Sequence, residues 1–333
     1  MNSYKVYGIG AALVDTEIQV EDSDLAAMGV AKGVMTLVDP TRQAELIEHL
    51  QRHLVKASHA SGGSAGNSMI AIAQFGGPTF MSCKVADDTD GNIYLSDLKS
   101  AGVDHCAGDE RENGTTGKCL VLITPDAERS MNTNLGISET LSVEQLDASA
   151  IARSEYLYVE GYLVTSPTGL AAAVEARVTA QASGVKTALS FSDPGMVEFF
   201  REAMEAIVGD KLDLIFCNEA EAKAWAGSED INEAIEALKQ VANSFAITLG
   251  SKGAITFDGQ QLTNIAPHTV QAVDTNGAGD MFAGAFMYAI TRGEDFATAG
   301  RFGSLAAARV VSSFGPRLSA AACTELRQAF FND

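Results

Sequence analysis

Seven residues, DTNGAGD at 274–280, lead directly into the apolar segment 281–290. Small residues let the backbone turn tightly and bring its N–H groups close to a ligand, and the apolar segment has the length of a buried helix. Free N–H groups and the helix dipole at such a helix start favour a phosphate-like anion. A fixed carboxylate repels an anion, so Asp280 is expected to have a chemical role rather than to bind the anion. Abstraction of a proton from an attacking hydroxyl group is a role that suits a carboxylate. Alternatively, Asp280 caps the helix and the glycines only form a turn.

A second glycine-rich stretch, SGGSAGN at 61–67, precedes an apolar helix that we expect at residues 68–75. The adjacent Gly62 and Gly63 permit close approach of the backbone to a ligand. Asn67 both donates and accepts hydrogen bonds, as a sugar diol requires. The same composition also suits a flexible linker or a plain helix start.

Two further polar segments follow apolar runs of strand length. In NEAE at 218–221, Asn218 and Glu221 lie on one face of an expected helix start, where the carboxylate is suited to hold Mg²⁺ through water. The same spacing also makes a capping box. TLGSKGA at 248–254 offers a hydroxyl, backbone groups and Lys252 to a phosphate chain, or it forms an ordinary turn. The sequence contains neither a Walker A motif nor a complete G-x-G-x-x-G fingerprint.

The elements that must position these residues alternate between strands and helices. Apolar runs of strand length occupy residues 4–13, 80–85, 156–163, 186–192 and 212–217. Helical patterns separate the later runs, which predicts an α/β fold with a mostly parallel sheet and helices on both of its faces. Ligands of such sheets bind beyond the carboxyl ends of the strands, where Asp193, Asn218 and Gly250 fall.

The stretch 14–38 interrupts this alternation. Asp15 and Glu17 share one parity and apolar residues the other, which predicts a strand with one face in water. Further short strands are expected at residues 34–38, 118–124 and 128–132, the last two joined by a turn. A helix is expected at 42–54. The inserted strands around 14–38 and 116–134 therefore predict a small lid on a single domain that spans residues 1–333.

The composition argues against several classes of protein. The 333 residues, 46% of them hydrophobic, suffice for a large core and a smaller appendage. A net charge of −20 argues against nucleic-acid binding. No apolar run reaches the roughly 18 residues of a membrane span, and the start of the chain does not look like a signal peptide. The five cysteines are widely spaced without C-x-x-C, which indicates neither a disulfide framework nor a zinc site. A cytoplasmic protein without a nucleic-acid or membrane partner is expected.

The motifs SGGSAGN, NEAE, TLGSKGA and DTNGAGDMFAGAF occur in an order that resembles the ribokinase-like (PfkB) family of carbohydrate and nucleoside kinases, over essentially the whole chain. Asn276, which departs from the threonine of ribokinase, and RSMNTNLG at 129–136 look more like the adenosine kinase branch. The resemblance implies a three-layer α/β/α sandwich with a small β-sheet lid. It also implies ATP-dependent transfer of the γ-phosphoryl group to a primary hydroxymethyl group of a nucleoside, with Mg²⁺. A monovalent cation such as K⁺, near Asp274 and residues 313–315, is implied as well.

The resemblance assigns roles to the residues that match the family's motifs. Asp280 would be the base, and the backbone amides of Gly277, Ala278 and Gly279 would stabilise charge on the transferring phosphoryl group. The residues that would hold the sugar hydroxyls are Asp15, Gly62, Gly63 and Asn67. Those that would hold ATP and its metal are Asn218, Thr248 and Gly250, with Glu221 for Mg²⁺.

A nucleoside kinase needs an apolar surface for the base. Candidate residues are Leu37, Val38, Leu135 and Phe199. The alternative is a kinase for a free sugar such as ribose, fructose or a keto-deoxy sugar acid. Its pocket would be smaller and more polar, with a cation such as Arg129 or Lys118 for an acidic sugar.

A non-catalytic ligand sensor on the same fold is a third possibility. It would keep the sugar-binding residues and lose the base, so the presence of Asp280 argues against it. Members of the family occur both as monomers and as dimers joined through the lid, and either state is compatible with the sequence.

Overall fold

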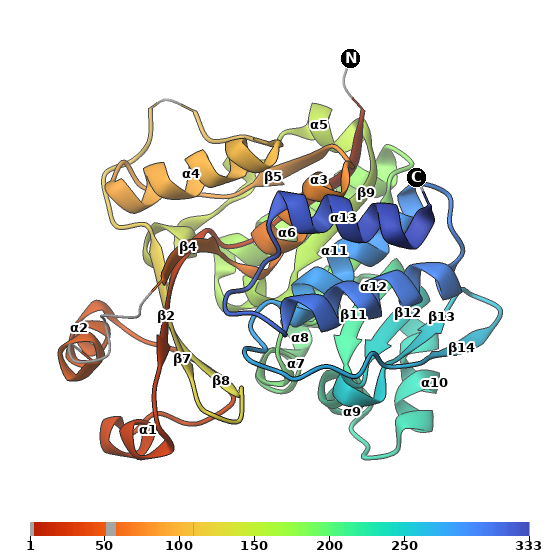
Figure 1. Cartoon of the computed structure of the whole chain (residues 1–333). Helices are drawn as coiled ribbons and strands as arrows, with labels where there is room; N and C mark the ends of the chain where they lie inside the picture. Colours follow the sequence, from red (N-terminus) through yellow and green to blue (C-terminus); the bar gives the residue numbers. More distant parts are fainter. Residues whose placement is uncertain (1–2, 51–57, 109, 333) are drawn as a thin grey trace.

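The computed structural model describes residues 3–50, 58–108 and 110–332. Its larger part is built on a nine-stranded sheet with the order β14-β13-β12-β11-β10-β9-β1-β5-β6 (Figure 1). The strands from β12 to β6 run parallel, and β13 and β14 add an antiparallel hairpin. The strand bounds are β1 Tyr4–Ile9, β5 Thr79–Ser82, β6 Val103–His105, β9 Ser154–Glu160, β10 Lys186–Ser190, β11 Leu212–Asn218, β12 Ala242–Thr248, β13 Ala254–Phe257 and β14 Leu262–Ile265.

Side chains of these strands alternate between two hydrophobic cores. Val6 and Leu214 lie in the core shared with α3, α4, α11, α12 and α13, whereas Tyr7 and Ile215 lie in the core shared with α5 to α10. The first group of helices is α3 Ser64–Phe75, α4 Thr89–Ala101, α11 Ala278–Thr291, α12 Phe296–Val310 and α13 Ala320–Phe331. The second is α5 Ala148–Ala152, α6 Pro167–Ala182, α7 Pro194–Phe199, α8 Arg201–Val208, α9 Glu219–Ala226 and α10 Ile231–Val241. The predicted α/β/α sandwich is confirmed.

Most of these helices start at a residue whose short polar side chain satisfies a free N–H group of the first turn. Side chains that accept such a bond belong to Asp88, Ser166, Asn218, Asp295 and Ser319. The helix α11 differs, because it follows Gly277 in the left-handed conformation and has no side-chain cap. Its first N–H groups therefore remain free of a capping side chain.

A second, five-stranded sheet has the order β3-β8-β7-β2-β4, and we call it the lid sheet. Its bounds are β2 Leu13–Gln19, β3 Met35–Leu37, β4 Ser58–Gly62, β7 Gly117–Ile123 and β8 Arg129–Asn134, with the helices α1 Asp22–Met28 and α2 Pro40–His49. Ile18 and Leu120 pack with both helices on one face. Val121 lies on the other face and packs against Phe314 of the larger part. Figure 1 shows β2, β7 and β8 beside the large sheet, with α1 and α2 on their far side.

The structure corrects several expectations from the sequence. The helix expected from Ser68 begins at Ser64, and the helix α1 and strand β4 were not expected. The strand expected at 156–163 ends at Glu160, because a 3₁₀ turn follows. The helix expected at 42–54 runs over Pro40–His49, and the remainder of that range lies mostly outside the described residues. In the described part of the chain, no helix has the length and apolar character needed to cross a bilayer.

The expectation of a wet face on strand β2 was wrong. Asp15 and Glu17 are 6% and 1% exposed, although their parity matched a solvated strand face. The pattern misled because β2 is an interior strand of the lid sheet, and this face turns toward the larger part of the protein rather than toward solvent. Two buried carboxylates on one strand require a polar environment, which the site supplies.

Candidate active site

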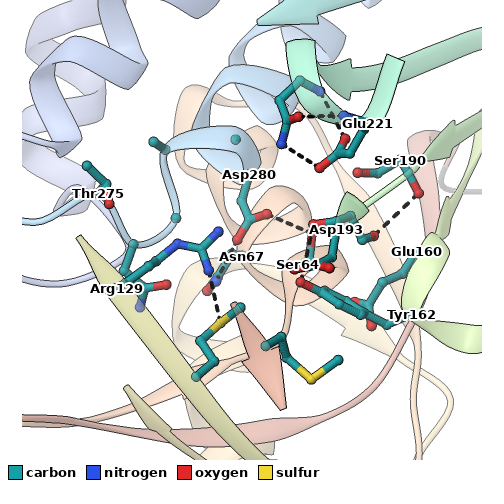
Figure 2. A pocket seen from close by; sticks show the side chains of 18 of the residues that line it. Ser64, Asn67, Arg129, Glu160, Tyr162, Ser190, Asp193, Glu221, Thr275 and Asp280 are labelled. Carbon is teal, nitrogen blue, oxygen red and sulfur yellow. Dashed lines mark hydrogen bonds between the residues drawn. The ribbon is translucent and has the colours of Figure 1, made fainter. Parts of the chain in front are cut away.

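A cavity of about 640 Å³ opens between the lid sheet and the carboxyl ends of the parallel strands. Side chains from both sheets and from the helix starts point into it (Figure 2). All the residues that the resemblance assigned to catalysis, to the sugar hydroxyls, to ATP or to Mg²⁺ line this cavity, except Gly62. The structure therefore brings together motifs that are as much as 265 residues apart in the chain, from Asp15 to Asp280.

Asp280 lies in the first turn of α11, and its carboxylate faces the cavity. One oxygen accepts a hydrogen bond of 2.7 Å from Oγ of Ser64, and the other accepts one of 2.9 Å from Nδ2 of Asn67. Burial raises the pKa of Asp280, while these two bonds and the charge of Arg129 oppose the rise. The carboxylate is thus oriented by two donors, and its raised pKa makes it a stronger proton acceptor than an exposed aspartate.

Residues 274–280 form the loop that precedes α11, and we call them the anion loop. A Cβ at Gly277, where φ is +71°, would overlap the carbonyl oxygen of Pro316, so only glycine fits. A Cβ at Gly279 would meet no protein atom within 4 Å, and this residue lines the cavity. The N–H of Ala278 donates a bond of 3.3 Å to the carbonyl of Thr275. The loop therefore presents an uncapped helix start to the cavity, as an anion requires.

The predicted acceptor residues form a polar corner beside Asp280. Asp15 packs so closely against Gly62 that a Cβ there would overlap its carboxylate, and a Cβ at Gly63 would overlap the carbonyl of Ala11. Burial and the neighbouring Glu17 raise the pKa of Asp15 to about 7. The Oδ1 atom of Asn67 is buried and has no hydrogen-bond partner among the described residues. An acceptor of this kind is normally satisfied, which indicates that a ligand hydroxyl completes this corner.

The predicted nucleotide residues line the cavity from the ends of strands β11 and β12. Asn218 and Thr248 are paired at the carboxyl ends of β11 and β12, and Gly250 follows in a 3₁₀ turn. Glu221 forms the capping box: its oxygens accept bonds of 2.9 Å from N and 2.6 Å from Nδ2 of Asn218. Burial raises the pKa of Glu221 to about 7.

A metal at Glu221 stays a prediction. Nowhere in the described ranges are three or more His, Cys, Asp or Glu side chains arranged to hold a metal ion. Mg²⁺ keeps several waters and takes few protein ligands, so the single carboxyl of Glu221 fits a contact through water. Oxygen donors from Asn218 and Glu221 are also of the type that Mg²⁺ prefers.

Arg129, at the start of β8, is the only Lys or Arg among the described residues that line the cavity. Figure 2 shows its guanidinium on the same side as Asp280. Its nearest recorded acceptor is Sδ of Met131 at 3.1 Å, a weak partner for a cation. The other cation considered from the sequence, Lys118, pairs with Asp90 at 2.7 Å and does not line the cavity.

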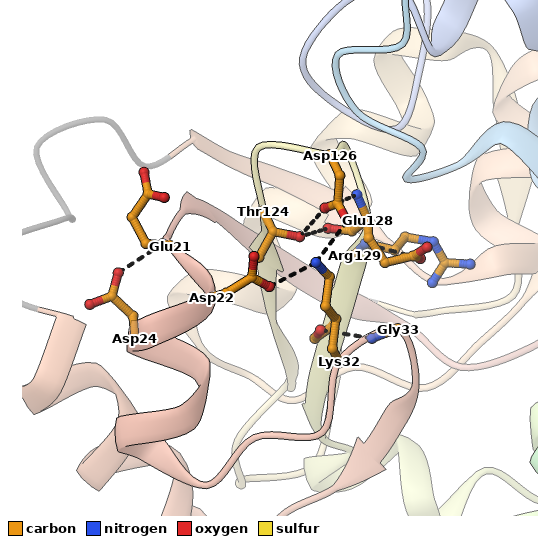
Figure 3. A network of polar contacts seen from close by, with 10 residues as sticks. Glu21, Asp22, Asp24, Lys32, Gly33, Thr124, Asp126, Glu128 and Arg129 are labelled. Atoms are coloured by element: carbon orange, nitrogen blue, oxygen red, sulfur yellow. Dashed lines mark hydrogen bonds and ion pairs between the residues drawn. The ribbon is translucent and has the colours of Figure 1, made fainter.

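The turn before Arg129 is held by charged side chains of the lid (Figure 3). Nζ of Lys32 pairs with carboxylate oxygens of Asp22 and Asp126, each at 2.7 Å. Thr124 donates a bond of 2.7 Å to the other oxygen of Asp126. Exposed ion pairs add little stability, so their consequence here is geometric. They fix the turn from which Arg129 enters the cavity.

Glu160 is a buried residue of the site that sequence reasoning missed. Its oxygens accept bonds of 3.2 Å from N of Ala11 and 2.8 Å from N of Ala65. Burial raises the pKa of Glu160 to about 7, and the two N–H donors oppose this. The sequence feature that could have indicated Glu160 is a carboxylate at the end of an apolar strand, where ligands of parallel sheets bind. It was overlooked because the strand was expected to continue past Glu160.

Apolar side chains also line the cavity, several of them from the lid strands β2, β3 and β8, and we call them the apolar wall. Its residues are Leu13, Met35, Leu37, Met131, Leu135 and Tyr162. Of the four residues proposed from the sequence for a base-binding surface, Leu37 and Leu135 belong to this wall. Val38 does not line the cavity, and Phe199 is 80% exposed outside it. Those two expectations were wrong, because neither side chain is turned toward the cavity.

A buried, oriented carboxylate beside an uncapped helix start, in a crevice beyond parallel strands, is the arrangement that a phosphotransferase acting on an alcohol group requires. Comparison with known proteins specifies the family. Residues 30–323 match the sequence model of the pfkB family of carbohydrate kinases. The chain belongs to the pfkB family, as the resemblance implied. Enzymes of this family use ATP, generally with Mg²⁺.

Three similar proteins illustrate the relationship. The structure of adenosine kinase from Sinorhizobium meliloti is 34% identical with a TM-score of 0.93, and the match covers 98% of this chain and 100% of that one. A probable sugar kinase from Rhizobium etli is 30% identical with a TM-score of 0.92, covering 99% of each chain. Adenosine kinase from Schizophyllum commune is 28% identical over 95% of this chain and 97% of its own length. The similar proteins thus include nucleoside kinases and a sugar kinase.

Proposed function

We propose that this kinase transfers the γ-phosphoryl group of ATP to the primary hydroxymethyl group of a nucleoside, with adenosine as the first candidate. The observation that carries the proposal is that one cavity is lined both by the polar corner and by the apolar wall. A nucleoside has a polar sugar and a flat, largely apolar base, and the two surfaces match these two parts. The similarity to the Sinorhizobium meliloti adenosine kinase supports the same substrate class.

In this proposal the polar corner orients the acceptor. Asp15 accepts hydrogen bonds from the sugar hydroxyls, and Oδ1 of Asn67 accepts another. Gly62 leaves room for the Asp15 carboxylate, and Gly63 leaves room for the carbonyl of Ala11. The hydroxymethyl group then lies next to Asp280. Its proton passes to the Asp280 carboxylate as the oxygen attacks phosphorus.

The anion loop and Arg129 stabilise the charge that develops during transfer. The backbone N–H groups of Gly277, Ala278 and Gly279 are the proposed donors at the helix start. ATP supplies the phosphoryl group when bound, and Asn218, Thr248 and Gly250 are the residues proposed to hold it. Glu221 would orient the waters of Mg²⁺.

The remaining features of the proposal concern ions, assembly and location. A monovalent cation such as K⁺ is proposed near Asp274 and residues 313–315. The Asp274 carboxylate already accepts N–H groups of Asn276 and Gly315 at 2.8 and 2.9 Å. Activity compared in K⁺ and in choline chloride tests this ion. We also propose that the enzyme is cytoplasmic and is either a monomer or a homodimer. Size-exclusion chromatography measures its oligomeric state.

The second candidate function is phosphorylation of a free sugar, including a keto-deoxy sugar acid. Arg129 favours it, because this cation lines the cavity, has no hydrogen bond to a carboxylate in the described part of the chain, and would bind an acidic sugar. The likeness to the Rhizobium etli probable sugar kinase points the same way.

An acceptor panel distinguishes the two candidates. ADP release is measured with ATP and Mg²⁺ over nucleosides, ribose, fructose and a keto-deoxy sugar acid, with Asp280→Asn as the blank. A kcat/KM for adenosine or another nucleoside well above that for every free sugar supports the proposal. Turnover of sugars alone would overturn the nucleoside assignment, and no turnover of any acceptor would favour a ligand sensor.

A further inference from the structure

The lid strand β2 carries two buried carboxylates that serve different parts of the site. Asp15 and Glu17 lie two residues apart and therefore on the same face of the strand. Asp15 belongs to the polar corner, whereas Oε1 of Glu17 accepts a hydrogen bond of 3.0 Å from Nδ2 of Asn276. Asn276 is 6% exposed, so this bond between the lid sheet and the anion loop is shielded from water. A hydrogen bond shielded from water is stronger than one exposed to solvent.

Asn276 is held at its backbone as well as at its side chain. Its N–H donates a bond of 2.8 Å to Oδ1 of Asp274, and Oδ2 of Asp274 accepts one of 2.9 Å from N of Gly315. The next residue in the chain is Gly277, where the turn into α11 begins. The hydrogen bond that Asn276 donates to Glu17 therefore fixes the side chain of Asn276, which immediately precedes the turn.

A second bond joins the lid to the same loop. Oγ1 of Thr275 donates a hydrogen bond of 2.9 Å to the carbonyl of Ala127, in the turn between β7 and β8. Ala127 has φ of +64°, an uncommon conformation for alanine, and is 3% exposed. Two successive residues of the anion loop are thus tied to two different parts of the lid.

The length of the Asn276 side chain allows its amide to reach Glu17. Asparagine carries its donor nitrogen one atom beyond the point where a threonine side chain ends. In this fold the amide spans the distance to Glu17, which a hydroxyl on Cβ would not. The departure from the threonine of ribokinase therefore coincides with a carboxylate partner on β2.

We propose that Glu17 is a positioning residue that couples acceptor binding to the anion loop. Asp15 ties β2 to the acceptor, and Glu17 ties the same strand to Asn276 and so to the N–H groups of Gly277 and Gly279. An acceptor bound at Asp15 fixes the position of β2. Through Glu17 it also fixes the N–H groups of the anion loop that stabilise the transferring phosphoryl group. This inference rests on the proposed binding of the acceptor at Asp15.

The test is a double-mutant cycle on Glu17 and Asn276. Steady-state kcat and acceptor KM are measured for Glu17→Ala, Asn276→Ala and the double variant. The acceptor is whichever member of the panel the wild-type chain phosphorylates, so a wrong choice of nucleoside does not affect the test. Gln19→Ala is the matched control, since Gln19 lies on the same strand and face but is exposed.

Each single substitution is expected to lower kcat by about tenfold, the loss expected when one buried hydrogen bond is removed, with acceptor KM changed less than about threefold. The double variant is expected to lose no more than either single one. Glu17→Gln should keep most of kcat, because its amide oxygen still accepts the bond. Gln19→Ala should match the wild type.

Two results would overturn the proposal: losses in kcat that multiply in the double variant, or a raised KM with unchanged kcat. The second result would assign Glu17 to the acceptor corner alone. Thermal unfolding is recorded for every variant. If Glu17→Ala does not fold, Glu17→Leu, which fills the same space with apolar atoms, replaces it in the cycle and is read by the same two criteria.

Discussion

Gly279→Ala separates the stability of α11 from the chemistry at its first turn. Gly279 is the second residue of the helix, and a Cβ there would meet no protein atom within 4 Å. Nothing in the protein therefore opposes an alanine. The free space around Gly279 is part of the cavity, where the transferring phosphoryl group is proposed to lie.

The two expected effects have opposite signs. Alanine stabilises a helix by about 0.5–1 kcal/mol relative to glycine. The entropy of unfolding of a protein of this size is roughly 0.7 kcal/mol per kelvin. The gain in stability divided by this entropy gives a rise in Tm of about 1 °C. The added methyl group would displace the phosphoryl group by about 1 Å, and a misplacement of that size costs on the order of 10²-fold in turnover. The variant should therefore be slightly more stable and nearly inactive.

Differential scanning calorimetry measures the first effect and steady-state kcat the second. Gly108→Ala is the control, because Gly108 also has free space and no positive φ but does not line the cavity. It should keep full activity. A Gly279→Ala enzyme that is stabilised and as active as the wild type would refute the assignment of this space to the phosphoryl group. A destabilised variant would refute the packing argument instead.

Two further predictions follow from the carboxylates of the site. Asn67→Leu removes the bond to Asp280 and the free Oδ1, and it should lower kcat/KM by about 10- to 100-fold, as measured by ADP release, with the fold retained in thermal unfolding. Asp15, Glu160 and Glu221 have pKa values raised to about 7, so the folded state binds protons that the unfolded chain has already released. The free energy of unfolding should therefore fall as pH rises from about 5 to 8, and denaturant titrations should show a smaller fall in Glu160→Gln. A free energy of unfolding that rises over this range would contradict the assigned direction.

The anion loop could be predicted from the sequence because its information is local. Small residues followed by an apolar helix specify a turn with free N–H groups whatever surrounds them. The alternation of apolar runs likewise predicted a mostly parallel sheet with helices on both of its faces. The hairpin of β7 and β8 followed from its turn residues and short spacing.

Contacts between distant segments could not be predicted in this way. Arg129 was considered only as a cation for an acidic sugar, because nothing local places it on the same side of the cavity as Asp280. Asp15 and Glu17 matched a solvated strand face, since parity shows which residues share a face and not what covers it. The partner of Asn276 required the register of the lid sheet against the anion loop.

The most direct test of the proposed mechanism is phosphorylation of adenosine by the wild-type enzyme and by Asp280→Asn, with the product identified by ³¹P NMR. We expect AMP and ADP from the wild type, and no phosphorylated product from 5′-deoxyadenosine, which lacks the acceptor hydroxyl. Asp280→Asn should bind ATP and lose turnover by about 10²- to 10⁴-fold, the range for a positioned general base. An Asn variant within a few-fold of the wild type would contradict the role of Asp280 as the base.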